Sequence, residues 1–124
     1  MIDFNQESLF KLDAVNYDTF DDLIVPILVD GEEIEQVYQG YRDGLVITNK
    51  RLIAINVKGL SGAKVDMTSI PFSKICMYSI ETKGTIDLDA ELDIWISTVG
   101  KIRFCFSSNS CMHDAGKLIC KHLL

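Results

Sequence analysis

Four carboxylates at alternate positions are the clearest candidates for chemistry in this sequence. Asp87, Asp89, Glu91 and Asp93 occupy every second position of the segment GTIDLDAELDIWI at 84–96. In an extended strand they would share one face, with neighbours about 6.5–7 Å apart. Carboxylate oxygens are ligands for hard cations such as Ca²⁺. A straight strand cannot wrap around an ion, however, and the glycine and distal glutamate of an EF-hand loop are missing, which disfavours a metal site.

Two other hypotheses fit the same acidic strand. Charges at alternate positions are typical of the solvent face of a half-buried strand. Trp95 continues that face, and a tryptophan beside carboxylates suits a subunit or partner interface with a charged rim. Basic groups of a second subunit, such as Lys50, Arg51 or Lys64, would then neutralise the acids. The metal site, the solvated face and the interface all remain open from the sequence.

Cysteine and histidine recur at a spacing that could bind zinc. The segments CMH (111–113) and CKH (120–122) both carry ligand types that zinc accepts. On one helix Cys111 and His122 would lie about 16 Å apart, and residues two positions apart point about 200° apart. One subunit therefore cannot gather all four ligands around one ion, and zinc binding would need contact between copies. Reduced, mostly buried thiols are the favoured interpretation of the cysteines.

The sequence contains the residue types of a catalytic triad but no catalytic motif. His113 and Asp114 are adjacent and several serines precede them, yet adjacency in sequence is not triad geometry. A nucleophile elbow, a Walker loop and a dinucleotide fingerprint are all missing, and GLSG (59–62) has the composition of a turn. We therefore expect no enzymatic activity and no cofactor.

Composition narrows the classes of partner. The chain has 124 residues, enough for one domain, and a net charge of -6 that disfavours nucleic acid and anionic membranes. A mean hydropathy of +0.16 favours some burial between subunits. No apolar run approaches the ~20 residues of a membrane span, and the first residues do not have the pattern of a signal peptide. We expect a cytoplasmic protein.

Helices are predicted near both ends of the chain. After residues 1–17, which show no clear period and could form an arm or a short helix, Asp18 is a plausible N-cap. The apolar stripe that follows comprises Phe20, Leu23, Ile24, Ile27 and Leu28. Pro26 predicts a kink or an early end. A second helix is predicted over 110–124, with N-cap candidates at 108–110 and an apolar face of Met112, Ala115, Leu118, Ile119 and Leu123.

Between the helices the pattern predicts about seven short strands. Apolar or alternating runs separated by turn residues occur at 33–41, 45–48, 52–55, 64–70, 75–81, 84–96 and 101–106. Short strands at regular spacing are typical of an all-β sandwich or barrel.

Four ordered motifs carry a family resemblance. The segments DGLVITNKRLI (43–53), GLSGAK (59–64), SIPF (69–72) and DLDAELDIWI (87–96) resemble the bacterial pleckstrin-homology-like (PH-like) domain family. The resemblance is strong over residues 20–98 and looser over the C-terminal helix. It implies one mainly β (α+β) domain over 1–124, a PH-like barrel of about seven antiparallel strands in two bent sheets. A C-terminal helix would cap the barrel, and a short N-terminal helix would precede it.

The same resemblance implies a non-catalytic function. It implies a non-catalytic interaction module that forms a ring-shaped homo-oligomer, with five subunits as the expected number, and docks other proteins. One alternative is a membrane adaptor that binds anionic lipid or phosphate headgroups, through basic residues at Arg42, Lys50, Arg51 and Lys64. A second alternative is a metal-binding protein or enzyme that uses the acidic strand. The chain departs from the family pattern at 105–111 and 1–17.

Overall fold

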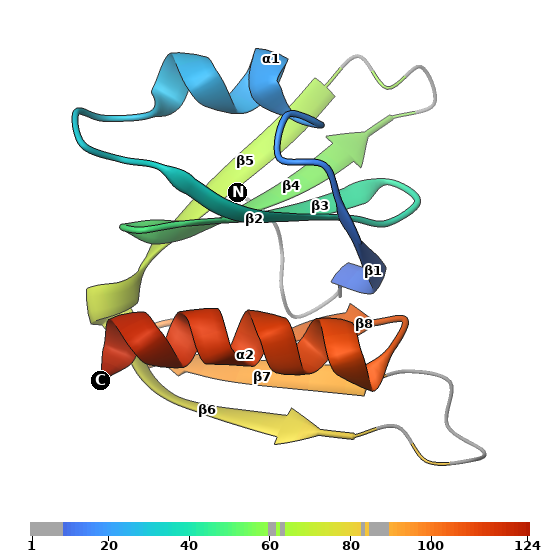
Figure 1. Cartoon of the computed structure of the whole chain (residues 1–124), viewed down its shortest axis with the longest axis vertical. Coiled ribbons are helices and arrows are strands. Elements are labelled where there is room, and N and C mark those ends of the chain that lie inside the picture. The colour runs from blue at the N-terminus through green and yellow to red at the C-terminus, as the bar shows by residue number, and fades with distance from the viewer. Residues whose placement is uncertain (1–8, 60–61, 63, 83, 85–89) are drawn as a thin grey trace.

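The computed structural model describes residues 9–59, 62, 64–82, 84 and 90–124, with side chains from Lys11 onward (Figure 1). The described strands are β1 (Leu9–Val15), β2 (Ile34–Gln39), β3 (Asp43–Thr48), β4 (Arg51–Lys58), β5 (Lys64–Pro71), β6 (Ile75–Glu81), β7 (Ala90–Ile96) and β8 (Gly100–Phe106). They form one bent sheet in the order β5-β4-β3-β2-β1-β8-β7-β6. The helical elements are α1 (Asp21–Ile24), η1 (Val25–Ile27), η2 (Phe72–Lys74) and α2 (Asn109–Leu123). The expected mainly β, PH-like class is confirmed, with eight described strands instead of about seven.

Strand β1 connects the two halves of the molecule, and it was not predicted. It pairs antiparallel with β2 and parallel with β8, so the two expected sheets are continuous by hydrogen bonding. Residues 9–15 therefore form a strand, where the sequence suggested an arm or a short helix. Lys11 has φ of +56° and the β1–β8 register shifts between Leu9 and Leu12. This irregularity interrupts the period of two, which explains why the pattern gave no strand signal.

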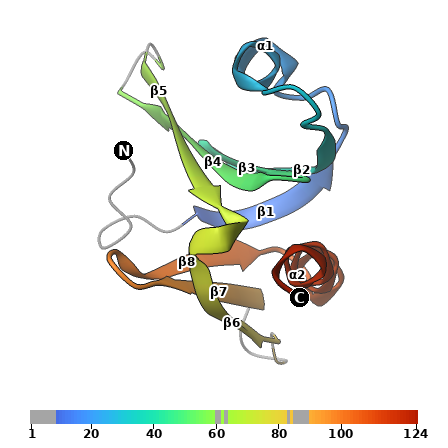
Figure 2. The same cartoon turned by 90° about the vertical axis from the view of Figure 1, so that its left-hand side faces the viewer.

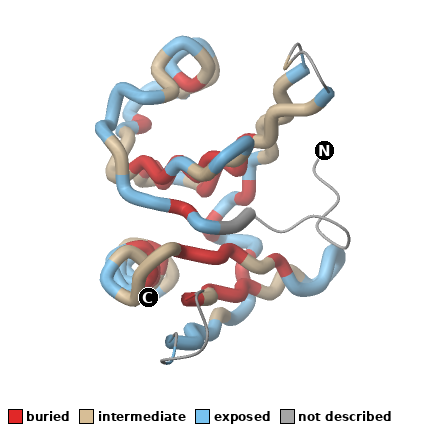
Figure 3. The backbone as a smooth tube through the Cα atoms, turned by 90° about the vertical axis from the view of Figure 1, so that its right-hand side faces the viewer, coloured by how far each residue is buried: buried red, intermediate tan, exposed pale blue. Residues whose placement is uncertain are grey.

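The larger half of the sheet is buried on both faces (Figures 2 and 3). On one face, Val37, Val46 and Ile53 pack beneath α1 and η1. On the other face, side chains from β2 to β4 join those of β7, β8 and α2 in the main core. There the ring of Tyr38 meets that of Phe106 edge-on, at a centroid distance of 5.3 Å. Burial on both faces accounts for the nearly continuous apolar sequences of β3 and β4.

The first predicted helix is shorter than its apolar stripe. α1 ends at Ile24 and gives way to η1, which contains Pro26, in agreement with the expected interruption. Asp18 is not the N-cap, because Phe20 holds that position without a side-chain cap. Asp18 belongs instead to a preceding turn, in which the Thr19 hydroxyl donates to the Asn16 carbonyl at 2.7 Å.

The C-terminal helix forms as predicted. Ser108 is the N-cap, and its hydroxyl accepts a hydrogen bond from the Cys111 N–H at 3.1 Å. Met112, Ala115 and Ile119 are fully buried on the helix face that meets the sheet. The helix lies across the open side of the bent sheet, beside β7 and β6 (Figures 1 and 2).

Candidate interaction site

Strand β6 and helix α2 form the two walls of a groove, called here the β6–α2 groove. Within the described part of the chain, β6 pairs with β7 alone and is the last strand of the sheet. Its outer edge therefore presents backbone N–H and C=O groups that no described strand uses. Such an edge can accept an added strand.

Two neighbouring cavities lie in this groove. The larger, of about 510 Å³, lies between Phe72, Ile75 and Tyr78 on one side and His122 and Leu123 on the other. The smaller, of about 220 Å³, is lined by Tyr78, Ile80, His113, Gly116, Lys117 and Cys120. Tyr78 lines both and separates them. The groove consequently offers two places for side chains along one strand.

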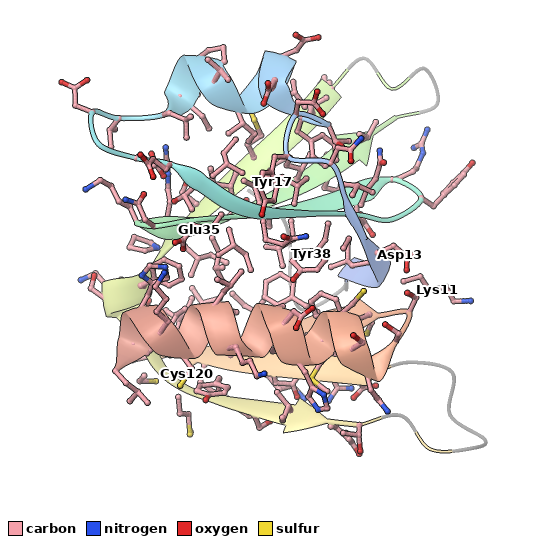
Figure 4. The ribbon with its side chains drawn as sticks, viewed as in Figure 1. Lys11, Asp13, Tyr17, Glu35, Tyr38 and Cys120 are labelled. Atoms are coloured by element: carbon pink, nitrogen blue, oxygen red, sulfur yellow. The ribbon has the colours of Figure 1, made fainter. Side chains whose placement is uncertain are left out.

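The β6 wall is apolar, and its outer edge is open among the described strands. Ile80 is 46% exposed, although it lies on the same face of β6 as Tyr78. Tyr78 is half-buried, and its hydrogen bond with Cys120, followed by its burial, raises its pKa. This contact connects Tyr78 to the helix on the opposite wall, and Figure 4 marks Cys120 on the β6 side of α2.

Gly116 keeps the helix wall open beside the smaller cavity. A Cβ atom there would lie 3.5 Å from Leu92 Cδ1 and 3.7 Å from Ile80 Cγ2, which are ordinary contact distances. An alanine would therefore fit, but a larger side chain would extend into the groove. The missing side chain contributes directly to the space available to a ligand.

One end of the groove is fixed by Glu35 of β2 (Figure 4). Its carboxylate pairs with Lys121 Nζ at 3.2 Å and with His122 Nε2. The His122 ring in turn stacks on Phe72, with centroids 4.5 Å apart. Burial would raise the pKa of Glu35, but the hydrogen bonds from His122 and Lys121 outweigh it and lower that pKa. The last turn of α2 is thereby held in the position that shapes the larger cavity.

The acidic strand is partly neutralised within its own chain, by a residue that the sequence did not single out. Arg103 of β8 bonds to Asp93 through Nε–Oδ1 at 2.9 Å and Nη2–Oδ2 at 3.0 Å, and its Nη1 lies 3.3 Å from Glu91 Oε2. The bond with Asp93 raises the pKa of Arg103, whereas burial raises the pKa of Glu91. Asp93 and Arg103 are direct partners in the β7–β8 register. The sequence therefore contained a usable signal: pairing the predicted strands 84–96 and 101–106 would have placed Arg103 opposite the acidic residues.

The structure says less about the other predicted residues of the acidic strand. Asp87 and Asp89 lie outside the described residues. Trp95 is half-buried and lies on the same face as Asp93, opposite Met77 in the register. Within the described ranges, no group of three or more His, Cys, Asp or Glu residues could hold a metal ion.

The four predicted basic residues do not converge on one site. Arg51 is bonded to Glu32 through Nε–Oε2 at 2.8 Å and Nη2–Oε1 at 2.9 Å, and Nη2 also donates to the Ile27 carbonyl at 2.7 Å. It therefore fastens η1 to the sheet. Lys50 lies in the turn before β4, and Arg42 and Lys64 lie at the opposite end of β3 and β4. All three of these are exposed.

Burial alone would raise the pKa of Glu32. Hydrogen bonds from Arg51, the Thr48 hydroxyl and the Val29 N–H outweigh that effect and lower the pKa from 4.5 to about 2. The Glu32 side chain is fully shielded from solvent. Glu32 was not predicted, since its partners lie up to 19 residues away in the sequence.

A bent sheet with a C-terminal helix across its open side defines a PH-like domain. The family model of the bacterial PH domain matches residues 3–123, and the chain belongs to this family. The uncharacterized protein YjqA of Bacillus subtilis (strain 168) is 46% identical over 95 residues, covering 75% of this chain and 76% of YjqA. The uncharacterized YozO of the same organism is 29% identical over 97 residues, covering 78% of this chain and 83% of YozO.

Solved structures agree with the family. A DUF1696 family protein with a pleckstrin-homology domain from Shewanella loihica PV-4 gives a TM-score of 0.82 at 34% identity, covering 93% of this chain and 99% of its own. A pleckstrin homology domain from Shewanella amazonensis SB2B gives 0.72 at 36% identity, covering 89% and 90%. Among the described residues, no helix is both long and apolar enough to cross a membrane.

Proposed function

We propose that this bacterial PH-like domain is a non-catalytic interaction module of the cytoplasm, and that it docks an extended segment of another protein in the β6–α2 groove. The observation that carries the proposal is the outer edge of β6, which no described strand pairs and which lies beside two cavities. A segment added to β6 would use its own backbone for hydrogen bonds. Its alternate side chains would point toward α2 and enter the cavities.

The positions of the charged residues favour docking over the two alternatives. Arg51, one of the four candidates for contact with an anionic headgroup, donates its hydrogen bonds to Glu32, Ile27 and Ser69. Of the acidic strand, Glu91 and Asp93 are occupied by Arg103. Lipid binding through Arg51, or metal binding through Glu91 and Asp93, would have to break an existing ion pair, whereas the groove is open as it stands.

The docking proposal is tested by selecting peptides from a random display library against the folded protein. We expect binders whose affinity falls at least about tenfold, or roughly 1.4 kcal/mol, in Ile80→Lys. Val99→Lys is the matched control, because Val99 is 43% exposed and lies in the β7–β8 turn. Failure to select any binder, or equal loss in both variants, would reject the docking site.

We also propose that copies of the chain assemble into a closed ring, with five subunits as the expected number. The outer face of β6–β8 supports this idea, because Arg103 compensates two carboxylates there and Trp95 lies opposite the exposed Met77. A face with balanced charge and large apolar side chains is suited to burial. Contact with a different surface of the next copy would be heterologous, which generates rings when the rotation closes.

Native mass spectrometry tests the ring. The wild-type protein should give a single oligomeric species, and Trp95→Ala should shift the population toward monomer. Tyr41→Ala is the control, since Tyr41 is 97% exposed in the turn between β2 and β3. A monomeric wild-type protein would disprove self-assembly without affecting the docking proposal.

A further inference from the structure

We infer that the segment docked in the β6–α2 groove is acidic, and that it directs two apolar side chains, two or four residues apart, toward α2. This inference rests on the docking function proposed above. It adds the chemistry of the partner.

The groove is a strip whose described lining carries no carboxylate side chain, on a protein that is acidic overall. The residues that line its two cavities include His113, Lys117 and His122 but no aspartate or glutamate. The whole chain, by contrast, has 18 acidic and 12 basic residues. An acidic segment is therefore attracted to this strip and repelled by most of the remaining surface, which favours one binding position.

The nearby carboxylates leave the charge of Lys117 in place. Glu35 pairs with Lys121 and His122, so among the described lining residues the attraction to an acidic group rests on Lys117 and not on His122. Glu81 at the end of β6 and Asp114 in α2 are exposed and line neither cavity. Lys117 is exposed beside the smaller cavity, and Lys117 is the residue that we expect to meet the acidic group.

The cavities determine the apolar positions. Side chains on one face of a strand recur every second residue, about 7 Å apart, so two cavities on either side of Tyr78 correspond to a spacing of two or four residues. The smaller cavity is bounded by Ile80, the ring of Tyr78 and the open surface at Gly116, which suits an aliphatic side chain. The larger one, between Phe72, Ile75 and Leu123, has room for an aromatic side chain.

The inference is tested with the same peptide library, the wild-type protein and two charge-reversal variants. We expect selected peptides to be enriched in Asp and Glu around two apolar residues at this spacing. A synthetic copy of an enriched peptide should bind Lys117→Glu about tenfold more weakly than the wild type. Its binding should weaken with added salt, because the contact is partly exposed. Lys64→Glu is the control, since Lys64 is exposed at the start of β5, away from the groove.

The outcomes separate this inference from the function on which it rests. Peptides that need Ile80 but show no acidic bias, or that bind Lys117→Glu as tightly as the wild type, would overturn the acidic partner and leave the docking site standing. If no peptide is selected and only phosphatidylglycerol vesicles or a second copy of the chain bind through Lys117, both proposals fail. Unchanged thermal unfolding of the variants excludes loss of fold as the cause.

Discussion

Two arginines, Arg51 and Arg103, each pair with a carboxylate of low exposure and join segments that are separate in the sequence. Arg51 joins η1 to β4 through Glu32, and Arg103 joins β8 to β7 through Asp93. Removing Arg51 leaves the shielded Glu32 charge without compensation, which costs about 3–5 kcal/mol, and the cost at the more exposed Arg103–Asp93 pair is smaller. These residues are consequently structural, although in sequence they look like ordinary surface charges.

Acid should destabilise the protein through Glu32. Its folded-state pKa of about 2 lies below the ordinary value of 4.5, so the unfolded chain binds the proton first. The stabilisation is therefore present above pH 4.5 and is lost as the pH falls toward 2, with a total of about 3 kcal/mol. Urea denaturation across this range should show a steep fall for the wild type and a flatter one for Glu32→Gln. If the stability of both proteins fell equally with pH, Glu32 would not be the source of the acid sensitivity.

Arg103→Met should lower the free energy of unfolding by about 1–3 kcal/mol, because Asp93 is only 8% exposed and loses its hydrogen bonds, although the partly exposed arginine reduces the cost. Adding Asp93→Asn should recover part of the loss, since the unpaired charge is then removed. Urea denaturation of the two variants measures both effects. If Arg103→Met alone were as stable as the wild type, the Arg103–Asp93 pair would contribute nothing to stability.

The attachment of α1 depends on a glycine in a strand. A Cβ atom at Gly44 would lie 2.6 Å from Phe20 Cζ, closer than side chains tolerate. Gly44→Ala should therefore cost about 1–3 kcal/mol, and the cost should shrink in a Phe20→Leu background. Gly84→Ala is the control, because no atom of the described residues lies within 4 Å of its Cβ position. Additive effects in the double variant would contradict direct contact.

The apolar face of α2 divides into a buried centre and a half-buried margin. Ile119 is fully buried, whereas Leu118 and Leu123 are partly buried at the edge of the core. Ile119→Asp should abolish cooperative folding, because an unpaired charge would enter the core. Leu118→Asp should leave a folded but weaker protein. Circular dichroism during thermal unfolding distinguishes them, and the opposite ranking would require a different helix orientation.

Local sequence patterns predicted the strands and helices better than they predicted which of these elements are neighbours. The strand expected at 75–81 and the C-terminal helix match the structure closely, since period and capping residues are properties of a short segment. The β1 strand escaped prediction because its register shift at Lys11 hides the period. The Arg103–Asp93 pair and the groove at Tyr78 depend on which strands are neighbours. That information is non-local, so single-segment patterns do not contain it.

The molecule as a whole has one continuous sheet, and its β6 end lies beside the C-terminal helix (Figures 1 and 2). Helix α2 covers the core, yet it leaves two cavities open beside the outer edge of β6, which no described strand pairs. Glu35 holds the end of the helix in place, so the groove exists before a partner arrives. A preformed groove lowers the ordering cost of binding.

Amide hydrogen exchange of the protein, with and without a saturating selected peptide, tests this account most directly. If the peptide adds as a strand, the amides of β6 that do not bond to β7 should exchange much more slowly in the complex. Amides of β5, at the other end of the sheet, should be unchanged. Protection elsewhere with no change along β6 would contradict docking at the β6–α2 groove.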